Sequence, residues 1–319
     1  MLITRHYSNI KKLSSPLTAD YFLSILLSNM IEINGSTKLT GIIGHPIEHS
    51  VSPQMHNAAY EKLGLNYCYV PISIRPDDLE KALEGIRMLG FVGINVTIPH
   101  KEAVIPHLDE VTKISRLIGA VNVILNQEGR LVGYNTDGPG FIDSLKADAN
   151  FYVKGKNVVI LGAGGGAKAV ALSLAQDKVK TMVITDIIYE KAKNLSEYIN
   201  SHFDIAPYAC PVRSHELKKG IENCDLLVNS TPVGMRPKVN ECPIDEDYKI
   251  PSKAVVYDLV YNPLETKLLK LAKSKGAKPV SGIGMLIRQG ALAFSLFTEQ
   301  EPPLDVMKEA ALAALKPMK

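Results

Sequence analysis

The segment Gly93–Lys101, which reads GINVTIPHK, places three polar side chains where a strand is expected to end. Alternate residues of a β-strand face the same side, so Asn95 and Thr97 are predicted to project together. Pro99 fixes its own φ angle and ends the strand, which turns the chain and lets Lys101 reach the same place. A lysine ammonium donates three hydrogen bonds, and its pKa shifts readily in a site that excludes water. The segment is therefore a candidate for binding polar groups and for moving a proton.

Other polar segments are expected to converge on the same pocket: four lie in loops beside predicted strands, and the fifth begins a predicted helix. They are His49–Pro53, Gly119–Asn122, Asn135–Gly138, Tyr261–Pro263 and Gly284–Gly290. One further strand is predicted between the second and third of these segments. His45 and His49 lack a third ligand nearby, so they are interpreted as loop residues and no metal is implied. His56 lies in the helix that follows, and the sequence gives it no role.

A glycine-rich turn between a predicted strand and a predicted helix indicates a nucleotide-binding site. The segment Gly162–Ala167 reads GAGGGA, follows the apolar strand Lys156–Leu161 and precedes a helix predicted over Lys168–Gln176. Glycine permits the tight turn and the close approach of a pyrophosphate, and the free N–H groups at a helix start favour an anion. A tight turn without a ligand is the alternative, since the glycine pattern alone is weak evidence. The residues expected to hold the cofactor are Gly162, Ala163, Gly164, Gly165 and Gly166.

The residues after the next strand bear on which cofactor binds. In this kind of fold an acidic side chain there binds the ribose 2′-hydroxyl of NAD, whereas an arginine accommodates the 2′-phosphate of NADP. Asp186 follows the predicted strand Met182–Thr185, and Ile187 and Ile188 come next instead of arginine. Lys191, one helical turn further on, is the nearby cation. Taken alone, these residues favour NAD(H) over NADP(H); an Asp186 that only caps the following helix is the alternative.

Strands alternating with helices predict an α/β protein. The first region has predicted strands at Lys38–Ile43, Tyr67–Ile72 and Val92–Thr97, and a mostly parallel sheet is expected there. The second region has predicted strands at Lys156–Leu161, Met182–Thr185, Asp225–Asn229 and Val255–Asp258. Its near-continuous apolar runs predict a buried, doubly wound parallel sheet of the Rossmann type. Two helices, predicted over Gly284–Leu296 and Pro303–Leu315, follow.

The composition excludes several classes of protein. Of 319 residues, 46% are hydrophobic and 22% charged, which is ordinary for a globular protein. The formal net charge is only +3, and no dense block of Lys and Arg suggests nucleic acid. Apolar runs fall short of the roughly 18 residues that span a bilayer. The four cysteines, Cys68, Cys210, Cys224 and Cys242, form no C-x-x-C pair or zinc spacing, so reduced thiols and a cytoplasmic location are expected.

Residues 1–35 are predicted to be an N-terminal extension that precedes the first domain. The short apolar run at 21–27 follows Asp20 directly and lacks a clean cleavage site, so a signal peptide is disfavoured. Met30 begins the segment that leads into the first strand. We therefore expect residues 1–29 to be dispensable, as an extension or the product of a mis-called start codon.

Six motifs occur in the order known from shikimate dehydrogenases, and the chain resembles that family over about residues 36–319. The motifs are S-x-S-P-x-M-H-N, N-V-T-x-P-x-K, G-A-V-N, N-T-D-G, G-A-G-G and G-x-G-M-L-x-x-Q. Members of the family reduce 3-dehydroshikimate with a nicotinamide cofactor in aromatic amino-acid (chorismate) biosynthesis. The resemblance implies the same reaction here, with a small-molecule substrate and a monomeric or homodimeric protein.

The resemblance also implies site residues. Lys101 and Asp137 would form the catalytic acid–base pair, in which the ammonium of Lys101 supplies a proton to the ketone oxygen. Substrate binding would fall to Ser50, Ser52 and Tyr261 at the carboxylate, and to Asn95, Thr97, Asn122, Asp137 and Gln289 at hydroxyls or the ketone. Met235, on a loop near the nicotinamide, and Gly282 would join Asp186, Lys191 and the glycine-rich turn in the cofactor site.

The implied architecture has two domains with the site in the cleft between them. A substrate domain would comprise residues 36–136 and 282–319, and a dinucleotide-binding domain residues 137–281. Family members usually use NADP(H) and carry Asn-Arg-Ser/Thr where this chain has Asp186, Ile187 and Ile188. An NAD-dependent quinate/shikimate dehydrogenase therefore remains an alternative. A non-catalytic nucleotide-binding regulator is a remote one, since it would have no need of the Lys101–Asp137 pair.

Overall fold

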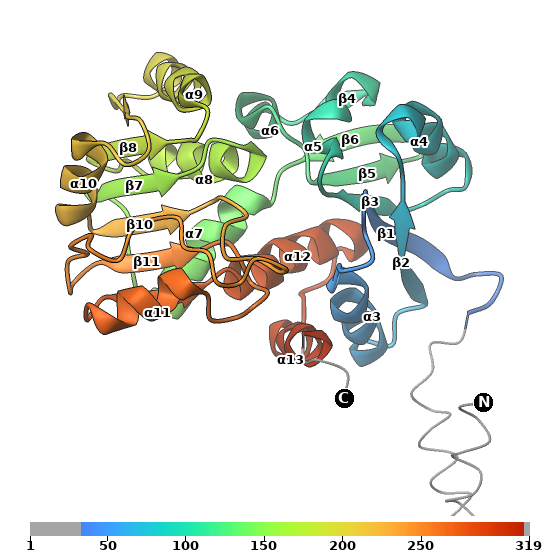
Figure 1. Ribbon diagram of the computed structural model, residues 1–319. Helices are drawn as coiled ribbons and strands as arrows, with labels where there is room; N and C mark the ends of the chain where they lie inside the picture. Colours follow the sequence, from blue (N-terminus) through green and yellow to red (C-terminus); the bar gives the residue numbers. More distant parts are fainter. Residues whose placement is uncertain (1–32, 316–319) are drawn as a thin grey trace, which may run out of the picture.

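Two six-stranded sheets lie side by side in the computed structural model, which describes residues 33–315 (Figure 1). All but the last three residues of the predicted extension 1–35 lie outside the described residues. Within residues 33–315, no helix is both long and apolar enough to cross a membrane.

The first sheet is mixed, with strand order β2-β1-β3-β5-β6-β4. Its strands are β1 (Lys38–Gly44), β2 (Tyr67–Ser73), β3 (Gly93–Val96), β4 (Glu110–Val111), β5 (Val123–Gln127) and β6 (Arg130–Tyr134). Strand β1 pairs in parallel with β2 and β3, whereas β5 is antiparallel to both β3 and β6. The single strand predicted between Asn122 and Asn135 is wrong, because two strands form a hairpin there.

A two-residue turn explains the hairpin. Glu128 and Gly129 connect Gln127 to its partner Arg130, and their φ angles are 54° and 88°. Positive φ at both central residues defines the tight turn whose twist matches an antiparallel pair. The side-chain oxygen of Asn126 accepts a hydrogen bond from Gly129 N at 2.8 Å and supports the turn. Glutamate is not a usual residue at positive φ, so this turn could not be predicted from the residue types.

The second sheet is entirely parallel, as predicted, with strand order β12-β11-β10-β7-β8-β9. Its strands are β7 (Asn157–Leu161), β8 (Thr181–Thr185), β9 (Tyr208–Ala209), β10 (Leu226–Asn229), β11 (Val255–Asp258) and β12 (Lys278–Ser281). Alternate residues of β7 point to opposite faces: Val158 and Ile160 join one buried cluster, Val159 and Leu161 another. Helices cover both faces, which is the doubly wound arrangement.

Helices pack on both sheets. On the second sheet, α7 (Asp137–Ala149), α8 (Gly165–Gln176) and α9 (Tyr189–His202) cover one face, and α10 (His215–Glu222) and α11 (Lys267–Ser274) the other. On the first sheet, α4 (Leu79–Met88) covers one face, and α3 (Ser52–Lys62), α12 (Ile283–Thr298) and α13 (Leu304–Ala314) the other. Two short helices, α5 (His100–Ala103) and α6 (Lys113–Ile118), and the 3₁₀ turns Pro76–Asp78 and Ile105–His107 complete the described chain. Helix α8 begins at Gly165 and not at Lys168 as predicted, since the glycines themselves form its first turn.

Helices α7 and α12 cross between the two sheets and join them (Figure 1). Their close approach depends on Gly140, where an added Cβ would lie 2.7 Å from Gln289 N and 2.9 Å from Gln289 Cβ. The hydroxyl of Thr136, just before α7, donates to the carbonyl oxygen of Gln289 at 3.0 Å. Helix α12 thereby brings its polar side chains to the ends of strands from the first sheet.

Candidate active site

Lys101 and Asp137 form an ion pair at the junction of the two sheets. The Lys101 Nζ atom lies 2.6 Å from Asp137 Oδ2, and the two side chains are 22% and 8% exposed. Short helix α5 holds Lys101 in place: its carbonyl oxygen accepts from Val121 N at 2.8 Å. The neighbouring His100 is buried, and its Nε2 donates to the carbonyl oxygen of Ile74 at 2.7 Å. These backbone and side-chain contacts hold α5 so that the Lys101 ammonium points at the Asp137 carboxylate. The low exposure of both side chains shields the ion pair from most of the solvent.

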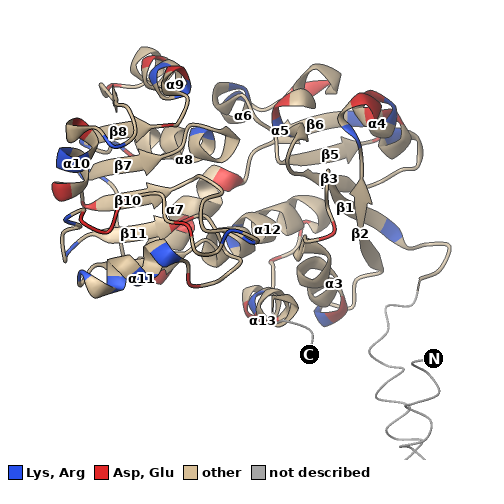
Figure 2. Cartoon of the chain, viewed as in Figure 1, with Lys and Arg blue, Asp and Glu red and all other residues tan. Residues whose placement is uncertain are grey.

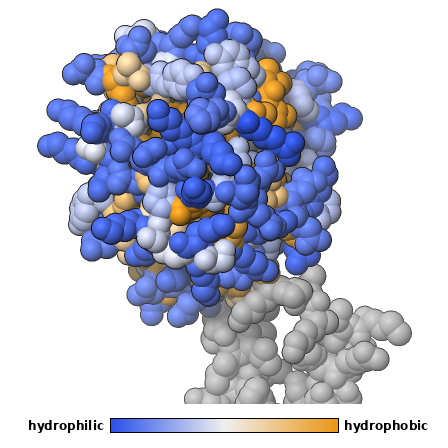
Figure 3. Space-filling view, turned by 60° about the vertical axis from the view of Figure 1, so that its left-hand side comes forward, coloured by the Kyte–Doolittle hydropathy of each residue, from blue (hydrophilic) through white to orange (hydrophobic). Residues whose placement is uncertain are grey.

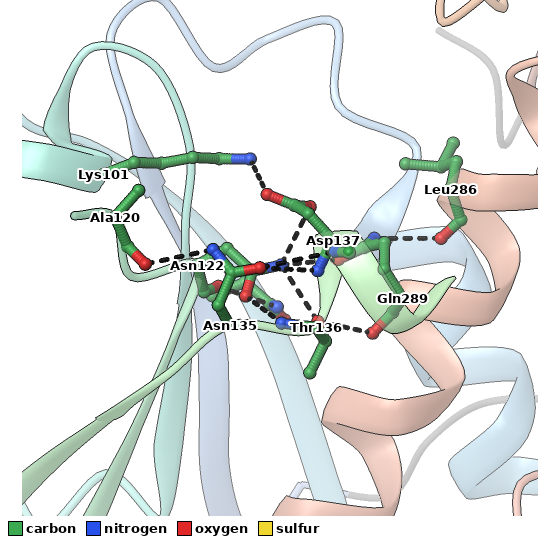
Figure 4. Close-up of polar contacts among 10 residues, drawn as sticks. Lys101, Ala120, Asn122, Asn135, Thr136, Asp137, Leu286 and Gln289 are labelled. Carbon is green, nitrogen blue, oxygen red and sulfur yellow. Dashed lines mark hydrogen bonds and ion pairs between the residues drawn. The ribbon is translucent and has the colours of Figure 1, made fainter. Parts of the chain in front are cut away.

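Asn122 connects the ion pair to helix α12 (Figure 4). Its Nδ2 atom donates to Asp137 Oδ1 at 3.0 Å, to Thr136 Oγ1 at 2.9 Å and to Gln289 Oε1 at 3.2 Å. Its Oδ1 atom accepts from Thr136 N at 2.7 Å. The Gln289 side chain is anchored in turn, because its Nε2 donates to Leu286 O at 2.9 Å. Both carboxylate oxygens of Asp137 therefore have a donor, and its orientation is set.

Asn135 lies in one of the polar segments expected at the pocket, but the sequence assigned it no role. Its Oδ1 accepts from Asp137 N at 3.1 Å and Gly138 N at 3.4 Å, which satisfies amides at the start of α7. Its Nδ2 donates to Ala120 O at 3.0 Å. The motif N-T-D-G thus ties α7 to the loop that carries Asn122, and so fixes where Asp137 begins the helix.

The other predicted substrate residues lie around this network, with different degrees of contact. Asn95 is buried, and its Nδ2 donates to the backbone oxygen of Asn122 at 3.2 Å. Ser52 opens α3, and its amide donates to Ser50 Oγ at 3.3 Å. Within residues 33–315, the side chains of Thr97 and Tyr261 make no hydrogen bond to these residues. The structure therefore joins Lys101, Asn122, Asp137, Gln289 and Asn95 in one network and pairs the two serines beside α3.

The glycine-rich turn leaves room for a ligand at the start of α8. Gly162 has φ of 103°, and an added Cβ there would lie 2.8 Å from Ser230 Oγ, so only glycine fits. By contrast, an added Cβ at Gly164 would meet nothing within 4 Å, and one at Gly165 only Glu102 Oε1 at 3.8 Å. The first amides of the helix lack acceptors within it and favour an anion. The open turn fits the pyrophosphate of a dinucleotide, with Gly164, Gly165 and Gly166 as its cradle.

Asp186 is turned toward this glycine-rich segment. Its Oδ2 accepts from Ala163 N at 2.8 Å and its Oδ1 from Ile188 N at 2.9 Å. Asp186 is only partly buried and Ile187 is 88% exposed, so a ribose has access to this position. The carboxylate supports the turn as well as offering its remaining lone pairs to a ligand.

A cavity of about 630 Å³ opens beside the turn, between α6, α8 and α9. Lys191 lines it, as do two cations that the sequence did not single out, Arg116 and Lys168. Lys168 Nζ lies 3.0 Å from Glu102 Oε1, an ion pair that reaches from α8 to α5, the helix of Lys101. Lys168 could have been predicted from the sequence as a residue of the cofactor site, since it directly follows the glycine-rich segment GAGGGA. Arg116 could not, because it reaches the cavity from a distant part of the chain.

Met235 and Gly282 lie at the edges of the predicted cofactor site. Met235 is 46% exposed on the loop after β10, and its amide donates to Pro232 O at 3.1 Å. Gly282 precedes α12, where an added Cβ would collide with the carbonyl oxygen of Leu259. Neither residue bonds to the glycine-rich turn within the described part of the chain.

A buried carboxylate, Asp258, holds the loop that carries Met235. Its Oδ1 accepts from Asn229 Nδ2 at 2.9 Å and Val260 N at 3.0 Å, and its Oδ2 from the Thr266 hydroxyl at 2.6 Å. Asn229 in turn accepts from Thr231 N and Thr231 Oγ1. Asp258 is fully buried, and this desolvation raises its pKa from 3.8 to about 6 despite the three donors.

This shift predicts a pH-dependent difference between the wild type and Asp258→Asn, which cannot titrate. A carboxyl whose pKa is raised by folding stabilises the native state fully below pH 3.8, and loses that contribution as the pH rises to about 6. The free energy of unfolding of the wild type minus that of the variant should fall over this window by about 1.4 kcal/mol per pKa unit. Denaturant titrations at half-unit steps of pH measure it. Parallel stability curves for the two proteins would contradict the raised pKa.

Comparison with known proteins agrees with this geometry. Three family models match: the shikimate dehydrogenase substrate binding domain at residues 42–124, shikimate/quinate 5-dehydrogenase at 145–247, and the shikimate 5′-dehydrogenase C-terminal domain at 282–312. A shikimate dehydrogenase (NADP⁺) of Methanopyrus kandleri is 44% identical over 290 residues, which cover 91% of this chain and all of that protein.

Solved structures give the same result. A crystal structure of a shikimate dehydrogenase in complex with NADP⁺ has a TM-score of 0.84 and 43% identity, covering 89% of this chain and 98% of that one. Quinate dehydrogenase from Corynebacterium glutamicum in complex with NAD has a TM-score of 0.80 and 34% identity, covering 87% and 99%. A Rossmann-type sheet, an adjoining α/β unit and a Lys–Asp pair between them define an oxidoreductase of the dehydrogenase class. The chain belongs to the shikimate dehydrogenase family.

Proposed function

We propose that the protein is a shikimate dehydrogenase, which reversibly reduces 3-dehydroshikimate to shikimate in the biosynthesis of chorismate and aromatic amino acids. The observation that carries the proposal is the Lys101–Asp137 ion pair, with Nζ and Oδ2 2.6 Å apart and both carboxylate oxygens hydrogen-bonded. It lies beside a glycine-rich turn that is open to a dinucleotide. The family membership of the chain supports the same reaction.

In the proposed mechanism a nicotinamide cofactor, held at the glycine-rich turn by Gly164, Gly165 and Gly166, would supply hydride to the ketone carbon or accept it in the reverse direction. Negative charge then develops on the ketone oxygen, and the Lys101 ammonium donates a proton to it. Asp137 holds the ammonium and balances its charge. When shikimate is oxidised, the neutral amine of Lys101 takes the hydroxyl proton. A positioned acid–base group of this kind contributes about 10²–10⁴ to the rate.

The remaining substrate contacts follow from the positions of polar groups around the pair. Asn95, Thr97, Asn122 and Gln289 would bind the ring hydroxyls or the ketone. Ser50 and Ser52, next to each other at the start of α3, would bind the carboxylate together with Tyr261. The cofactor would be held by Gly162–Gly166, Asp186, Lys191, Met235 and Gly282, to which the cavity adds Arg116 and Lys168.

The domain division belongs to the same proposal. We place the substrate domain at residues 36–136 and 282–319 and the dinucleotide-binding domain at 137–281. The two sheets and their separate buried clusters support it. The cavity between α6 and α8 then lies between the domains, and its wall includes Ala163, Gly164 and Lys191 of the proposed cofactor site.

We further propose a cytoplasmic protein, monomeric or homodimeric, that does not bind nucleic acid. Acidic and basic residues occur side by side on helices such as α4, α9 and α10 in Figure 2, and the formal net charge of +3 is small. The face shown in Figure 3 is mostly hydrophilic, with hydrophobic residues in small separate areas. Extended apolar patches would be expected of a surface that binds a large permanent partner.

Quinate is the substrate to compare with shikimate, because it differs by few polar groups and a quinate dehydrogenase is among the structural relatives. We expect the purified protein to oxidise shikimate with the larger kcat/KM. Initial rates with each substrate, at saturating NADP and at saturating NAD, measure the ratio. A larger kcat/KM for quinate would establish the alternative, an NAD- or NADP-dependent quinate/shikimate dehydrogenase.

The cofactor is NADP(H) or NAD(H), and two residues should shift the preference in opposite directions. Asp186→Asn removes a negative charge that would repel a 2′-phosphate, so the Kd ratio should move toward NADP by roughly tenfold. Lys191→Met removes an attractive charge and should move it toward NAD by about two- to fivefold. Titration calorimetry with NAD and NADP measures both constants.

Lys193→Met is the matched control for these variants. Lys193 lies on the same helix as Lys191 but pairs with Glu190 at 3.9 Å and does not line the cavity. It should leave both dissociation constants unchanged. Equal shifts for NAD and NADP in the Asp186 variant would mean that Asp186 acts only by supporting the glycine-rich turn.

A further inference from the structure

Asn95 has an amide orientation that its surroundings determine. Its Nδ2 lies 3.2 Å from the backbone oxygen of Asn122, which can only accept, so the amide nitrogen must face it. Its Oδ1 then faces the hydroxyl of Tyr69 at 2.8 Å, and that hydroxyl must donate. A flipped amide would place two acceptors against each other at the Asn122 carbonyl.

This orientation decides what Asn95 can offer to a ligand. The nitrogen has two N–H groups, and among the residues that the structure describes only one acceptor, the Asn122 oxygen, takes either of them. The second N–H is left for a substrate oxygen. Asn95 should therefore act toward the substrate as a hydrogen-bond donor.

Tyr69 is itself held from two sides by helix α3. The side chain of Asn57 binds both backbone groups of Tyr69: Oδ1 accepts from Tyr69 N at 2.8 Å, and Nδ2 donates to Tyr69 O at 3.0 Å. The ring of His56 stacks on the Tyr69 ring with centroids 4.2 Å apart and planes 10° apart. Tyr69 is 1% exposed, so its hydroxyl has no freedom to leave Asn95.

His56 can stack on Tyr69 because its ring is flat, buried and uncharged. It is 1% exposed and packs near Tyr60, Phe294 and Phe297. Within the described chain neither of its ring nitrogens has a hydrogen-bond partner. Burial lowers its pKa from 6.5 to about 3, so the ring stays uncharged at neutral pH.

We propose that Tyr69 is a positioning residue for the substrate site: braced by His56 and Asn57, its hydroxyl fixes the amide of Asn95 with one N–H free for a substrate hydroxyl. The inference rests on the proposed function, because it assumes that Asn95 binds the substrate. It gives a role to His56 and Asn57, which end the first motif and to which the proposed reaction assigns none. The two serines of that motif and its His-Asn pair then serve neighbouring parts of one substrate.

Tyr69→Phe tests the proposal, because it removes the donor to Asn95. The hydroxyl of Tyr69 also interacts with the side chain of Ser52, so the cycle with Asn95→Ala described below separates the two contacts. Loss of one such hydrogen bond should raise KM for shikimate about three- to tenfold. The kcat should change little, since binding is weakened equally before and during the reaction, and the Kd of the cofactor should not change. Initial-rate kinetics with varied shikimate give the split between KM and kcat.

Tyr60→Phe is a closely matched control. Tyr60 is also fully buried in the same cluster, and its hydroxyl also makes one side-chain hydrogen bond, to Thr40 Oγ1 at 2.8 Å. Both variants should lose similar thermal stability, which melting curves measure. Only Tyr69→Phe should raise KM, and an equal rise in the control would mean that KM follows the packing of the cluster.

A double-variant cycle with Asn95→Ala shows whether Tyr69 acts through Asn95. In the Asn95→Ala background, Tyr69→Phe should add nothing to KM, because the amide that it positions is absent. A full additional rise, or no rise in the single Tyr69 variant, would overturn the inference while leaving the proposed function intact. A wild type that does not turn over shikimate would instead overturn the proposed function, and this inference with it.

Discussion

Lys101→Ala should lower the kcat for shikimate oxidation by about 10²–10⁴ while the protein stays folded, because the variant loses its proton-transfer group. Lys101 Nζ contacts Asp137, and the surrounding fold does not depend on it: the backbone of Lys101 is held by Val121 N, which the substitution leaves in place. The Kd of the cofactor should remain within about threefold, since Lys101 is bound to Asp137 and not to the glycine-rich turn. Single-turnover measurements with saturating cofactor and substrate report the chemical step.

Lys81→Ala serves as its control. Lys81 is an exposed lysine on α4, on the far face of the first sheet from α12, and its loss should leave kcat unchanged. A small primary amine added to Lys101→Ala should restore part of the rate, because it can enter the space of the missing side chain and carry the proton. Near-normal turnover by the variant without added amine would remove Lys101 from the mechanism.

Asp137→Asn should lower kcat by about 10² or more, although the substitution is nearly isosteric. An asparagine oxygen can still accept from Asn122 Nδ2, but its amide nitrogen would then face Lys101 Nζ, and two donors would meet where an ion pair stood. The ammonium loses both its anchor and its counter-charge. Steady-state kinetics of the single and double variants with Lys101→Ala measure the coupling.

The two residues act as one unit, so the losses should not add: the double variant should be about as slow as the slower single variant. Asp148→Asn is the control from the same helix. Asp148 pairs with Arg288 at 3.0 Å and accepts from Ser144, away from the Lys101 network, so its loss should reduce stability and leave kcat unchanged. Multiplicative losses for Lys101→Ala and Asp137→Asn would show that they work independently.

Local patterns predicted the second sheet well. The apolar run Lys156–Leu161 becomes β7 (Asn157–Leu161), and Val255–Asp258 is β11, because strands buried on both faces need apolar residues at every position. The C-terminal helices were also predicted within one or two residues of their ends. In each case the pattern of apolar residues that predicts the element lies within the element itself.

Long-range contacts could not be predicted in this way. The hydrogen bond of Thr136 to Gln289 joins residues 153 positions apart, and no spacing within either motif implies it. Arg116 reaches the cavity beside Lys191 only because two separate units meet there. Tyr69 had the sequence signal of an ordinary strand residue, and its link to Asn95 follows from the parallel pairing of β1 with both β2 and β3. The resemblance to a family indicated which polar residues belong to the site, and the structure shows which residues they form hydrogen bonds with.

The measurement that tests the central claim most directly is the initial rate of NADPH or NADH formation when shikimate is added to the purified wild-type protein. The account predicts saturable turnover with at least one of the two cofactors, and a loss of at least about 10² in Lys101→Ala measured alongside. Binding of a dinucleotide without turnover of shikimate or quinate with either cofactor would contradict it. The protein would then be a nucleotide-binding regulator that retains the family's fold and site.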